Sequence, residues 1–472
     1  MSLTVAPIRL LMAGFCLLIA WPIAALALLG RDKDEEKVPL AGWRNMLRPI
    51  VVFFCRGVFF WGGLHWLSVK GKRATSQEAP IVALSPHSSY FDSVVVTYLD
   101  LTSVVAKSES EYVPIFGTLI RYTQPVFVSR EDPDSRVNTI KEIKRRAQSN
   151  GKWPQIVIFP EGTCTNRSCL ISFKPGAFYP GVPIQPVLIR YLNELDTVTW
   201  TWDGPGPFAV LWYTLCQFQT RMEIEFLPVY HPNTLELADP KLFANNVREE
   251  MARCLGVPVT DHTYDDCRLM QRAAINKLPM ASGLVEFYKL HQKLGLDFDT
   301  IKEMFDRFCK ICRGKPGRVT IEEFAKYLRL PVSDPLRTVF QLYDRAGSGY
   351  IDFREYVIGL SLVSGPAATE ETIQLAFTLF DSDGKGYISE EELSQILLNA
   401  FGMNDIDTHE LFKEVDADED GKITYDEFQA CAEKKPEYAK LFVTYREMSD
   451  SSKQNGHPGG EHGHDQPLNK AE

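Results

Sequence analysis

The chain has 472 residues, too many for one compact core, so we expect two or three domains. Its 45% hydrophobic and 24% charged residues are ordinary for globular protein. The net charge of -10 argues against nucleic acid as a partner, because phosphate recognition needs a basic surface. The ten cysteines follow no disulfide-framework spacing, and we interpret them as free thiols in a reducing compartment.

The first 74 residues are dominated by two apolar segments. Residues 10–30, "LLMAGFCLLIAWPIAALALLG", are long enough to cross a hydrocarbon layer of about 30 Å as a helix. The charged "DKDEEK" follows in place of a cleavage site, so we predict a retained, membrane-embedded signal anchor. Pro22 leaves two forms open, a straight span and a bend that returns to the same side.

The second apolar segment, residues 50–70, carries Arg56 at its centre. A buried arginine is costly in lipid, so we predict an interfacial, aromatic-rich helix over a second span. A core helix of the following domain is the alternative, because hydropathy alone does not separate the two.

Between residues 75 and 235, β-rich runs alternate with helical patterns such as "SRVNTIKEIKRRAQSNG". The runs are "APIVALS", "LTSVVAK", "QPVFVSR", "QIVIFPE", "VPIQPVLIR" and "MEIEFLPVY". Such alternation predicts an α/β domain. Residues 236–300 indicate a mostly helical extension, and the tail 449–472 has too little apolar content to fold, so we expect disorder there.

Residues 301–448 contain a repeat of about 35 residues that predicts an all-α calcium-binding domain. The segment "DADEDGKITYDE", 416–427, has the full spacing of an EF-hand loop, with early oxygen ligands, a glycine at the tight turn and a distal glutamate. Its predicted ligand residues are Asp416, Asp418, Asp420, Lys422 at the seventh position, and Glu427.

Three further loops depart from this pattern. Loop 381–392 keeps Asp381, Asp383 and Glu392, but Lys385 stands where an oxygen ligand belongs, so we expect weakened calcium affinity. Loop 344–355 lacks the third-position oxygen, and its calcium occupancy stays open; its ligand residues would be Asp344, Ser348, Tyr350 and Glu355. Loop 312–323 has no early ligands and is predicted to be a structural hand that completes a pair. Acidic surface turns are the alternative interpretation.

The stretch "PHSSYFDS", residues 86–93, places His87 and Asp92 five positions apart after an apolar run. On a continuous helix the two would point about 140° apart, so a strand end and a turn must bring them together. An aspartate bonded to one imidazole nitrogen fixes the tautomer and leaves the other nitrogen to take a proton from a hydroxyl. A lone H-x4-D is a weak signal, and its interpretation depends on neighbouring motifs.

Those motifs follow in order along the chain. "QPVFVSR" ends in Arg130, a cation suited to phosphate. "FPEGTCTNR", 159–167, ends another strand in a turn with polar donors and a close backbone approach. Together with "FKPGAF" it supplies Glu161, Gly162, Thr163, Lys174 and Gly176.

The order of these blocks, closed by "VPIQPV", resembles the glycerolipid (1-acylglycerol-3-phosphate) acyltransferase family over about residues 40–270. The forms "HSSYFD", "EGTCTNR" and "FKPGAF", followed by "WTW" and EF-hands, are similar to its lysophosphatidylcholine acyltransferase branch of types 1 and 2, with type 2 or a close paralogue as the nearer match. The resemblance implies an α/β acyltransferase domain with an N-terminal membrane-embedded helix, followed by an all-α EF-hand domain.

The resemblance also implies a reaction, acyl-CoA-dependent O-acylation of lysophosphatidylcholine or of lyso-platelet-activating factor. His87 would deprotonate the acceptor hydroxyl and Asp92 would orient His87. The substrate would be bound by Arg130, Glu161, Gly162, Thr163, Lys174 and Gly176. Ser129 departs from the aspartate that often precedes the arginine in the family.

Calcium in the EF-hands is the implied cofactor, with no catalytic metal. The implied partners are the phospholipid membrane, a lysophospholipid and acyl-CoA, and the implied location is the endoplasmic reticulum, the Golgi membrane and lipid droplets, with both domains in the cytosol. Two alternatives remain: an acyltransferase for lysophosphatidic acid or another head group, and a catalytically silent, calcium-responsive membrane adaptor.

Overall fold

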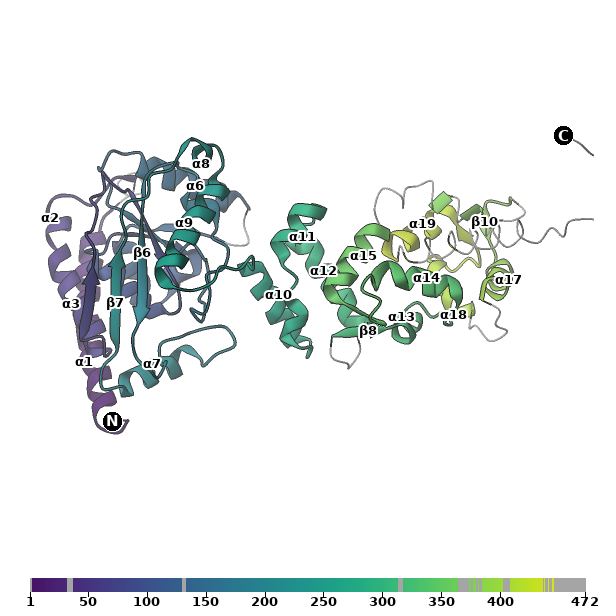
Figure 1. The fold of residues 1–472 in the computed structure, drawn as a ribbon, viewed down its shortest axis with the longest axis horizontal. Helices are drawn as coiled ribbons and strands as arrows, with labels where there is room; N and C mark the ends of the chain where they lie inside the picture. Colours follow the sequence, from purple (N-terminus) through teal and green to yellow (C-terminus); the bar gives the residue numbers. More distant parts are fainter. Residues whose placement is uncertain are drawn as a thin grey trace, which may run out of the picture. The chain divides into compact units, whose positions relative to one another are not determined.

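The computed structural model describes residues 2–31, 37–129, 133–312, 317–363, 384–401 and 408–435, and eight single residues at 373, 374, 377, 378, 381, 437, 440 and 444. The chain divides into two compact units, Met1–Tyr264 and Asp265–Glu472 (Figure 1). The predicted substrate residue Arg130, the predicted ligand Asp383 and the tail 449–472 lie outside the described residues.

The first unit is built on a seven-stranded sheet with the order β1-β7-β6-β2-β5-β3-β4. Its strands are β1 (Trp66–Lys70), β2 (Ile81–Ser85), β3 (Ser103–Lys107), β4 (Val126–Val128), β5 (Ile156–Ile158), β6 (Ile184–Tyr191) and β7 (Arg221–Phe226). Only the β6–β7 pair is antiparallel among these neighbours. The six predicted β-rich runs are confirmed as β2 to β7, and the carboxyl ends of β2, β5 and β6 meet at one edge of the sheet.

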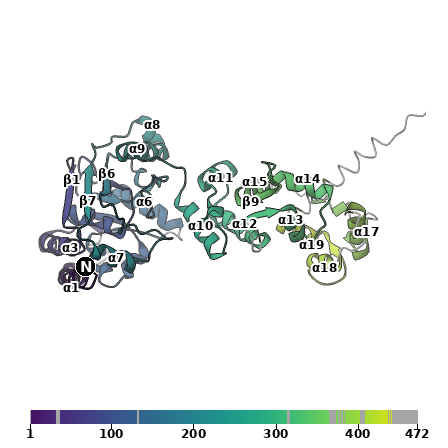
Figure 2. The same cartoon turned by 60° about the horizontal axis from the view of Figure 1, so that its bottom comes forward.

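Helices cover both faces of this sheet because its central strands are apolar on both sides. Ile81 and Ala83 pack with α6 (Pro133–Ala147) and α9 (Pro240–Leu255). The intervening Val82 and Leu84 pack with α4 (Val94–Tyr98) and α7 (Pro207–Cys216). In Figure 2, α9 and α8 (Thr234–Ala238) lie on one side of the sheet, and α1, α3 and α7 lie on the other.

The N-terminal helix α1 (Val5–Leu28) contains Pro22 and is, among the described residues, the one helix long and apolar enough to cross a membrane. It packs against α3 (Arg48–Trp61), which follows the short α2 (Gly42–Met46), and against α5 (Phe116–Tyr122). This arrangement confirms an N-terminal apolar helix where the anchor is predicted.

The single helix predicted over residues 50–70 is wrong at its C-terminal end. Helix α3 stops at Trp61, because Gly62 and Gly63 follow and Gly63 has φ +100°, a conformation that side chains with a Cβ rarely adopt. Residues 66–70 form the edge strand β1 instead. Half-exposed Arg56 lies 3.5 Å from Asp100, so its charge is paired within this unit.

The helical stretch predicted over 236–300 is shared between the two units. Phe243 and Val247 of α9 are buried in the core of the first unit. Helices α10 (Tyr264–Ile275) and α11 (Phe287–Leu294) contribute Leu269 and Phe287 to the core of the second. Amphipathic periodicity identifies such helices, but it does not indicate which core each one joins.

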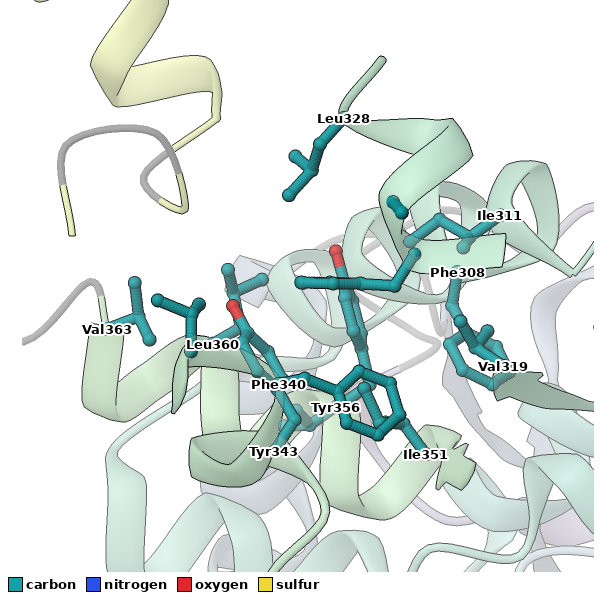
Figure 3. Close-up of a cluster of buried hydrophobic side chains, with 14 of the residues drawn as sticks. Phe308, Ile311, Val319, Leu328, Phe340, Tyr343, Ile351, Tyr356, Leu360 and Val363 are labelled. Carbon is teal, nitrogen blue, oxygen red and sulfur yellow. The ribbon is translucent and has the colours of Figure 1, made fainter. Parts of the chain in front are cut away.

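The second unit is helical, with short paired strands between its helices (Figure 3 shows part of its core). Its remaining elements are α12 (Phe298–Ile311), β8 (Arg318–Thr320), α13 (Ile321–Tyr327), α14 (Asp334–Tyr343), β9 (Tyr350–Asp352), α15 (Phe353–Val363), β10 (Tyr387–Ile388), α17 (Glu390–Phe401), α18 (Thr408–Val415), β11 (Ile423–Thr424) and α19 (Tyr425–Lys434). β8 pairs with β9 and β10 pairs with β11, both antiparallel. Val319 of β8 lies opposite Ile351 of β9, so the strand segments that belong to loops 312–323 and 344–355 are paired.

Candidate active site

The segment from β2 to Ser93 folds as a strand, a turn and a 3-10 helix, Tyr90–Ser93. Ser89 caps this short helix and Asp92 closes a capping box with the Ser89 backbone. The turn brings Nδ1 of His87 to 2.9 Å from Oδ2 of Asp92. The predicted acid/base geometry is therefore present at the carboxyl end of a central strand.

Asp92 is fully buried, and both of its oxygens accept hydrogen bonds. Oδ2 accepts from the Ser88 amide at 2.7 Å and the Ser89 amide at 2.9 Å, in addition to His87. Oδ1 accepts from the Tyr191 hydroxyl at 2.7 Å. A carboxylate held by so many donors keeps its position without a ligand.

The His87 ring is 21% exposed and lies against Phe159, with ring centroids 4.1 Å apart. Its Nε2 atom, which Asp92 leaves free for chemistry, is 3.5 Å from the Cys164 thiol. Burial lowers the pKa of His87, but the hydrogen bonds to Asp92 and Cys164 outweigh burial and raise this pKa to about 10. The imidazole is thus a stronger base than a solvated histidine.

Glu161 lies fully buried behind His87. Its Oε1 accepts from the Ser85 hydroxyl at 2.7 Å and from the His87 amide at 2.9 Å, and Thr165 contacts the other oxygen at 3.2 Å. Burial raises the pKa of Glu161 to about 7, against the opposing effect of these hydrogen bonds. The Thr165 amide donates to the His87 carbonyl at 2.7 Å, so the EGTCT turn holds the His87 backbone from both sides.

Of the other predicted substrate residues that the structure describes, Gly162 and Thr163 belong to this turn and Lys174 lies beside it. Gly162 has φ +69°, and a Cβ placed on it would lie 2.9 Å from Cε of Lys174, whose side chain passes alongside. The Lys174 amide donates to the Pro160 carbonyl at 2.8 Å, and its ammonium lies 4.9 Å from the centre of the Tyr264 ring. Thr163 and Gly176 are half-buried, and a Cβ on Gly176 would meet open space.

Sequence reasoning missed two residues of this site. Tyr191 is 99 positions from Asp92 yet contacts it, because β6 pairs in parallel with β2 and ends at the same edge. Cys164 stood within a quoted motif, but spacing gave no reason to place its thiol at Nε2. Parallel pairing of the two apolar runs was the signal that could have indicated Tyr191.

Comparison with known proteins gives matches to two family profiles and to several relatives. The acyltransferase family profile matches residues 67–190 and the profile of an EF-hand domain pair matches residues 370–432. Mouse lysophosphatidylcholine acyltransferase 1 is 52% identical over 444 residues, 94% of this chain and 83% of that protein. Human lysophosphatidylcholine acyltransferase 2 is 52% identical over 450 residues, 95% of this chain and 82% of that protein.

The chain belongs to the lysophosphatidylcholine acyltransferase family. It is an acyltransferase with a C-terminal EF-hand pair. The equal identities to types 1 and 2 do not favour one type. A solved structure, the 1-acyl-sn-glycerophosphate acyltransferase of Thermotoga maritima, is 18% identical, with a TM-score of 0.37, and the match covers 54% of this chain and 97% of that one.

In this lysophosphatidylcholine acyltransferase family member, loop 416–427 has the donor set that calcium requires. The carboxylates of Asp416, Asp418 and Asp420 each offer an oxygen within 4.8 Å of the others. A hydrogen bond from the Asp420 amide lowers the pKa of Asp418, but desolvation and the neighbouring carboxylates raise it overall. These three carboxylates repel one another, and a divalent cation placed between them would offset that repulsion.

Loop 381–392 contains a lysine that forms an ion pair within the loop. The Lys385 ammonium lies 3.5 Å from Oε1 of Glu392, the glutamate at the twelfth position of this loop. A calcium ion would have to displace this ion pair to gain both glutamate oxygens. The contact gives a structural reason for the weakened affinity predicted from the sequence.

Loop 344–355 is closed by its own hydrogen bonds. Asp344 accepts from the Ser348 amide at 2.8 Å and the Gly349 amide at 2.7 Å, and the Ser348 hydroxyl lies 2.9 Å from the Tyr350 carbonyl. Burial raises the pKa of Glu355, and the charges of Asp352 and Asp344 contribute to the same shift. The loop has a calcium-binding shape but one oxygen fewer than loop 416–427.

Proposed function

We propose that this acyltransferase moves the acyl group of acyl-CoA to the free hydroxyl of a lysophospholipid, lysophosphatidylcholine first and lyso-platelet-activating factor with acetyl-CoA second. The observation that most supports this function is the 2.9 Å contact between His87 Nδ1 and the fully buried Asp92. That contact leaves Nε2 as the proton acceptor at a partly exposed ring.

In the proposed reaction, Nε2 of His87 takes the proton of the acceptor hydroxyl as its oxygen attacks the thioester carbonyl. The tetrahedral intermediate collapses to an ester, the C–S bond breaks, and the CoA thiolate takes the proton back from His87. Asp92 stabilises the imidazolium between these two steps. Both transfers use one base, because the proton that enters from the alcohol leaves with the thiol.

Lys174 is the group we assign to a substrate phosphate. Its amide is held by Pro160, and its side chain crosses Gly162 beside the turn that supports His87. Thr163 and Gly176 would line the same approach, and Arg130 stays a proposed second phosphate ligand. Glu161 would act through the His87 backbone, since its carboxylate is buried and already accepts three hydrogen bonds.

We also propose that the enzyme works at endoplasmic reticulum and Golgi membranes and at lipid droplets, with both units on the cytosolic side where acyl-CoA is supplied. The apolar helix α1 and its packing partner α3 support a membrane-embedded first unit. Calcium would bind loop 416–427 with its full ligand set, and loops 381–392 and 344–355 more weakly.

The testing experiment measures acyl-CoA consumption by membranes containing wild type, His87→Ala or His231→Ala. Lysophosphatidylcholine, lyso-platelet-activating factor and lysophosphatidic acid are offered separately, each with calcium or a chelator. His231 is exposed and serves as the matched control. We expect wild type and His231→Ala to be active and His87→Ala to lose roughly 10²- to 10⁴-fold in rate.

Each outcome assigns a function. The acceptor with the highest rate names the head group, and a clear preference for lysophosphatidic acid would replace the proposed substrate. The ratio of the rate with calcium to the rate with chelator shows whether the EF-hands affect turnover. Background rates for all three proteins on every acceptor would reject catalysis and favour the calcium-responsive membrane adaptor.

A further inference from the structure

Helix α7 exposes aromatic side chains in a segment without charge. From Gly204 to Thr220 the sequence contains no Asp, Glu, Lys or Arg. Within it Phe208 is 85% exposed, Phe218 72%, Tyr213 50% and Trp212 36%. We call these four residues the α7 aromatic patch. Tryptophan and tyrosine in this setting are typical of the boundary between lipid and water.

The patch is joined to the membrane-embedded helix by a buried arginine. Nη1 of Arg9 in α1 lies 3.0 Å from the Leu215 carbonyl and 2.5 Å from the Gln217 carbonyl, and Nη2 lies 2.7 Å from the Phe218 carbonyl. These carbonyls are at the C-terminal end of α7, where they have no further helical partners. Figures 1 and 2 both place α7 beside the N-terminal part of α1.

The side chains that flank Arg9 in α1 are also exposed and apolar. Ile8 is 58% exposed and Leu11 is 74% exposed. Arginine near the end of an apolar helix usually reaches toward water or lipid head groups. Here Arg9 instead holds the end of α7 beside the N-terminal part of α1, so both elements expose apolar side chains near the same end of α1.

The opposite end of α7 contacts the catalytic segment. The Tyr90 hydroxyl donates to the Pro207 carbonyl at 3.1 Å, and the Tyr90 ring meets Trp200 edge-on with centroids 5.5 Å apart. The Trp200 amide donates to the Ser88 carbonyl at 2.8 Å. Ser88 in turn donates to Asp92, so four contacts lead from Pro207, the neighbour of Phe208, to the acid/base pair.

We propose that the α7 aromatic patch is a second membrane-contacting element, which seats in the interfacial layer of a phosphatidylcholine bilayer and presents the bilayer-borne lysophospholipid to His87. The lipid surface is the occupant because the patch lies beside the N-terminal part of the apolar helix α1, lacks charge and carries interfacial aromatics. The proposal deepens the proposed function and rests on it for the identity of the acceptor.

The first test compares two forms of one acceptor. Full-length protein in phosphatidylcholine vesicles is assayed with a long-chain lysophosphatidylcholine held in the bilayer and with a short-chain one dissolved as monomer. The variant is Phe208→Asp, and the matched control is Leu235→Asp in α8, where the leucine is 70% exposed. We expect Phe208→Asp to raise the apparent KM for the bilayer acceptor roughly tenfold or more, because an exposed apolar contact with lipid is lost.

The monomeric acceptor separates membrane contact from catalysis. Phe208→Asp should leave kcat and KM for this acceptor within about twofold of wild type, and Leu235→Asp should change neither acceptor. An equal loss on both acceptors, or no change on either, would overturn the proposal. Inactivity of the wild type on both acceptors would instead count against the proposed function.

The second test does not depend on activity. The tryptophan fluorescence of the full chain is recorded in vesicles with and without brominated lipid, and the contribution of Trp212 is taken from the difference between wild type and Trp212→Phe. Trp153, 5% exposed, gives the matched control through Trp153→Phe. Strong quenching of the Trp212 contribution alone supports the proposal.

Equal quenching of the two contributions would overturn it. An unquenched Trp212 would overturn it as well. If the wild type were also a dimer and Phe208→Asp a monomer, the α7 aromatic patch would be assigned to a second copy of the chain.

Discussion

The acid/base site and calcium loop 416–427 both rely on carboxylates, but they compensate the negative charge in opposite ways. Asp92 is completely buried, and its oxygens accept hydrogen bonds from two amides, a phenol and an imidazole. Asp418 and Asp420 are exposed, and with Asp416 they form a cluster within 4.8 Å. The proposed acid/base site would therefore be complete before substrate arrives, whereas calcium loop 416–427 would be completed by a cation.

This difference separates chemistry from binding. A change at Asp92 should alter the rate and its pH dependence and leave calcium binding intact. A change in loop 416–427 should alter calcium affinity and leave the rate in chelator intact. The following variants test this separation, beginning with the largest expected effect.

Asp92→Asn should lower kcat roughly 10³-fold or more, because the imidazole loses its orientation and the stabilisation of its charged form. Steady-state assays in membranes measure the loss, with Asp100→Asn as the control, since Asp100 is exposed and lies outside the acid/base pair. A variant that retains a tenth of the wild-type rate would contradict the role of Asp92.

The pH dependence sharpens the same test. Hydrogen bonds to Asp92 and Cys164 outweigh burial and raise the pKa of His87 to about 10, so kcat/KM should rise with pH through the neutral range as the base loses its proton. Removing the carboxylate lowers that pKa, so the acidic limb of the residual activity in Asp92→Asn should move to lower pH. A limb that stays in place would indicate that another group titrates.

Glu427→Gln should weaken calcium binding at least on the order of 10-fold, because the distal glutamate supplies two oxygens. Glu427 is already held for this task, with Oε2 accepting from the Thr424 amide at 2.9 Å. Isothermal titration of the purified full chain measures the affinity. The control is the acyl-transfer rate in chelator, which should equal that of wild type; a fall in that rate would mean that the second unit is needed for catalysis without calcium.

Lys385→Asp should strengthen calcium binding at loop 381–392 by about tenfold, since it removes the ion pair with Glu392 and adds an oxygen ligand. Lys422→Ala is the matched control, because Lys422 occupies the seventh position, where the backbone carbonyl binds. Calorimetry should show a second high-affinity site in Lys385→Asp and an unchanged isotherm in Lys422→Ala. Absence of the added site would mean that Lys385 is not what limits this loop.

Tyr191→Phe should lower kcat about fivefold, the smallest of these effects, because it removes one of four hydrogen bonds to Asp92, and such a bond contributes about 1 kcal/mol. Without the Tyr191 hydroxyl, Asp92 should stabilise protonated His87 more strongly and raise the pKa of His87. The acidic limb should therefore move to higher pH, opposite to its shift in Asp92→Asn. Opposite shifts in the two variants are the result to look for; shifts of the same sign would mean that Tyr191 acts elsewhere.

Much of the fold followed from local patterns. The apolar runs of β2 to β7 have the composition of buried strands, and the proline and serines after β2 indicate the turn that joins His87 to Asp92. Strand β1 was missed because the aromatic run continues through residues 50–70 without a change in hydropathy, and only Gly62 and Gly63 mark the break.

The rest of the site depended on contacts between distant segments. Tyr191 reaches Asp92 only because β6 lies beside β2, and strand order is not encoded in either strand alone. Glu161 was predicted to bind substrate from its motif, and its burial behind His87 favours a positioning role. The ligand set of loop 416–427 was visible from spacing, because all its members lie within twelve residues. Arg130 and Asp383 stay predictions.

The ion pair in loop 381–392 also sets how steeply the molecule can respond to calcium. EF-hands act in pairs, and the short strands β10 and β11 join loop 381–392 to loop 416–427, with Ile388 opposite Ile423. When both members of a pair take up an ion, each can favour the other and give a sigmoidal isotherm. With the Lys385 ammonium already against Glu392, one member contains a cation that competes with calcium for the glutamate. We therefore expect calcium binding to this pair to follow a hyperbola with a Hill coefficient near one. Its calcium occupancy would then rise gradually with calcium concentration and would show no threshold.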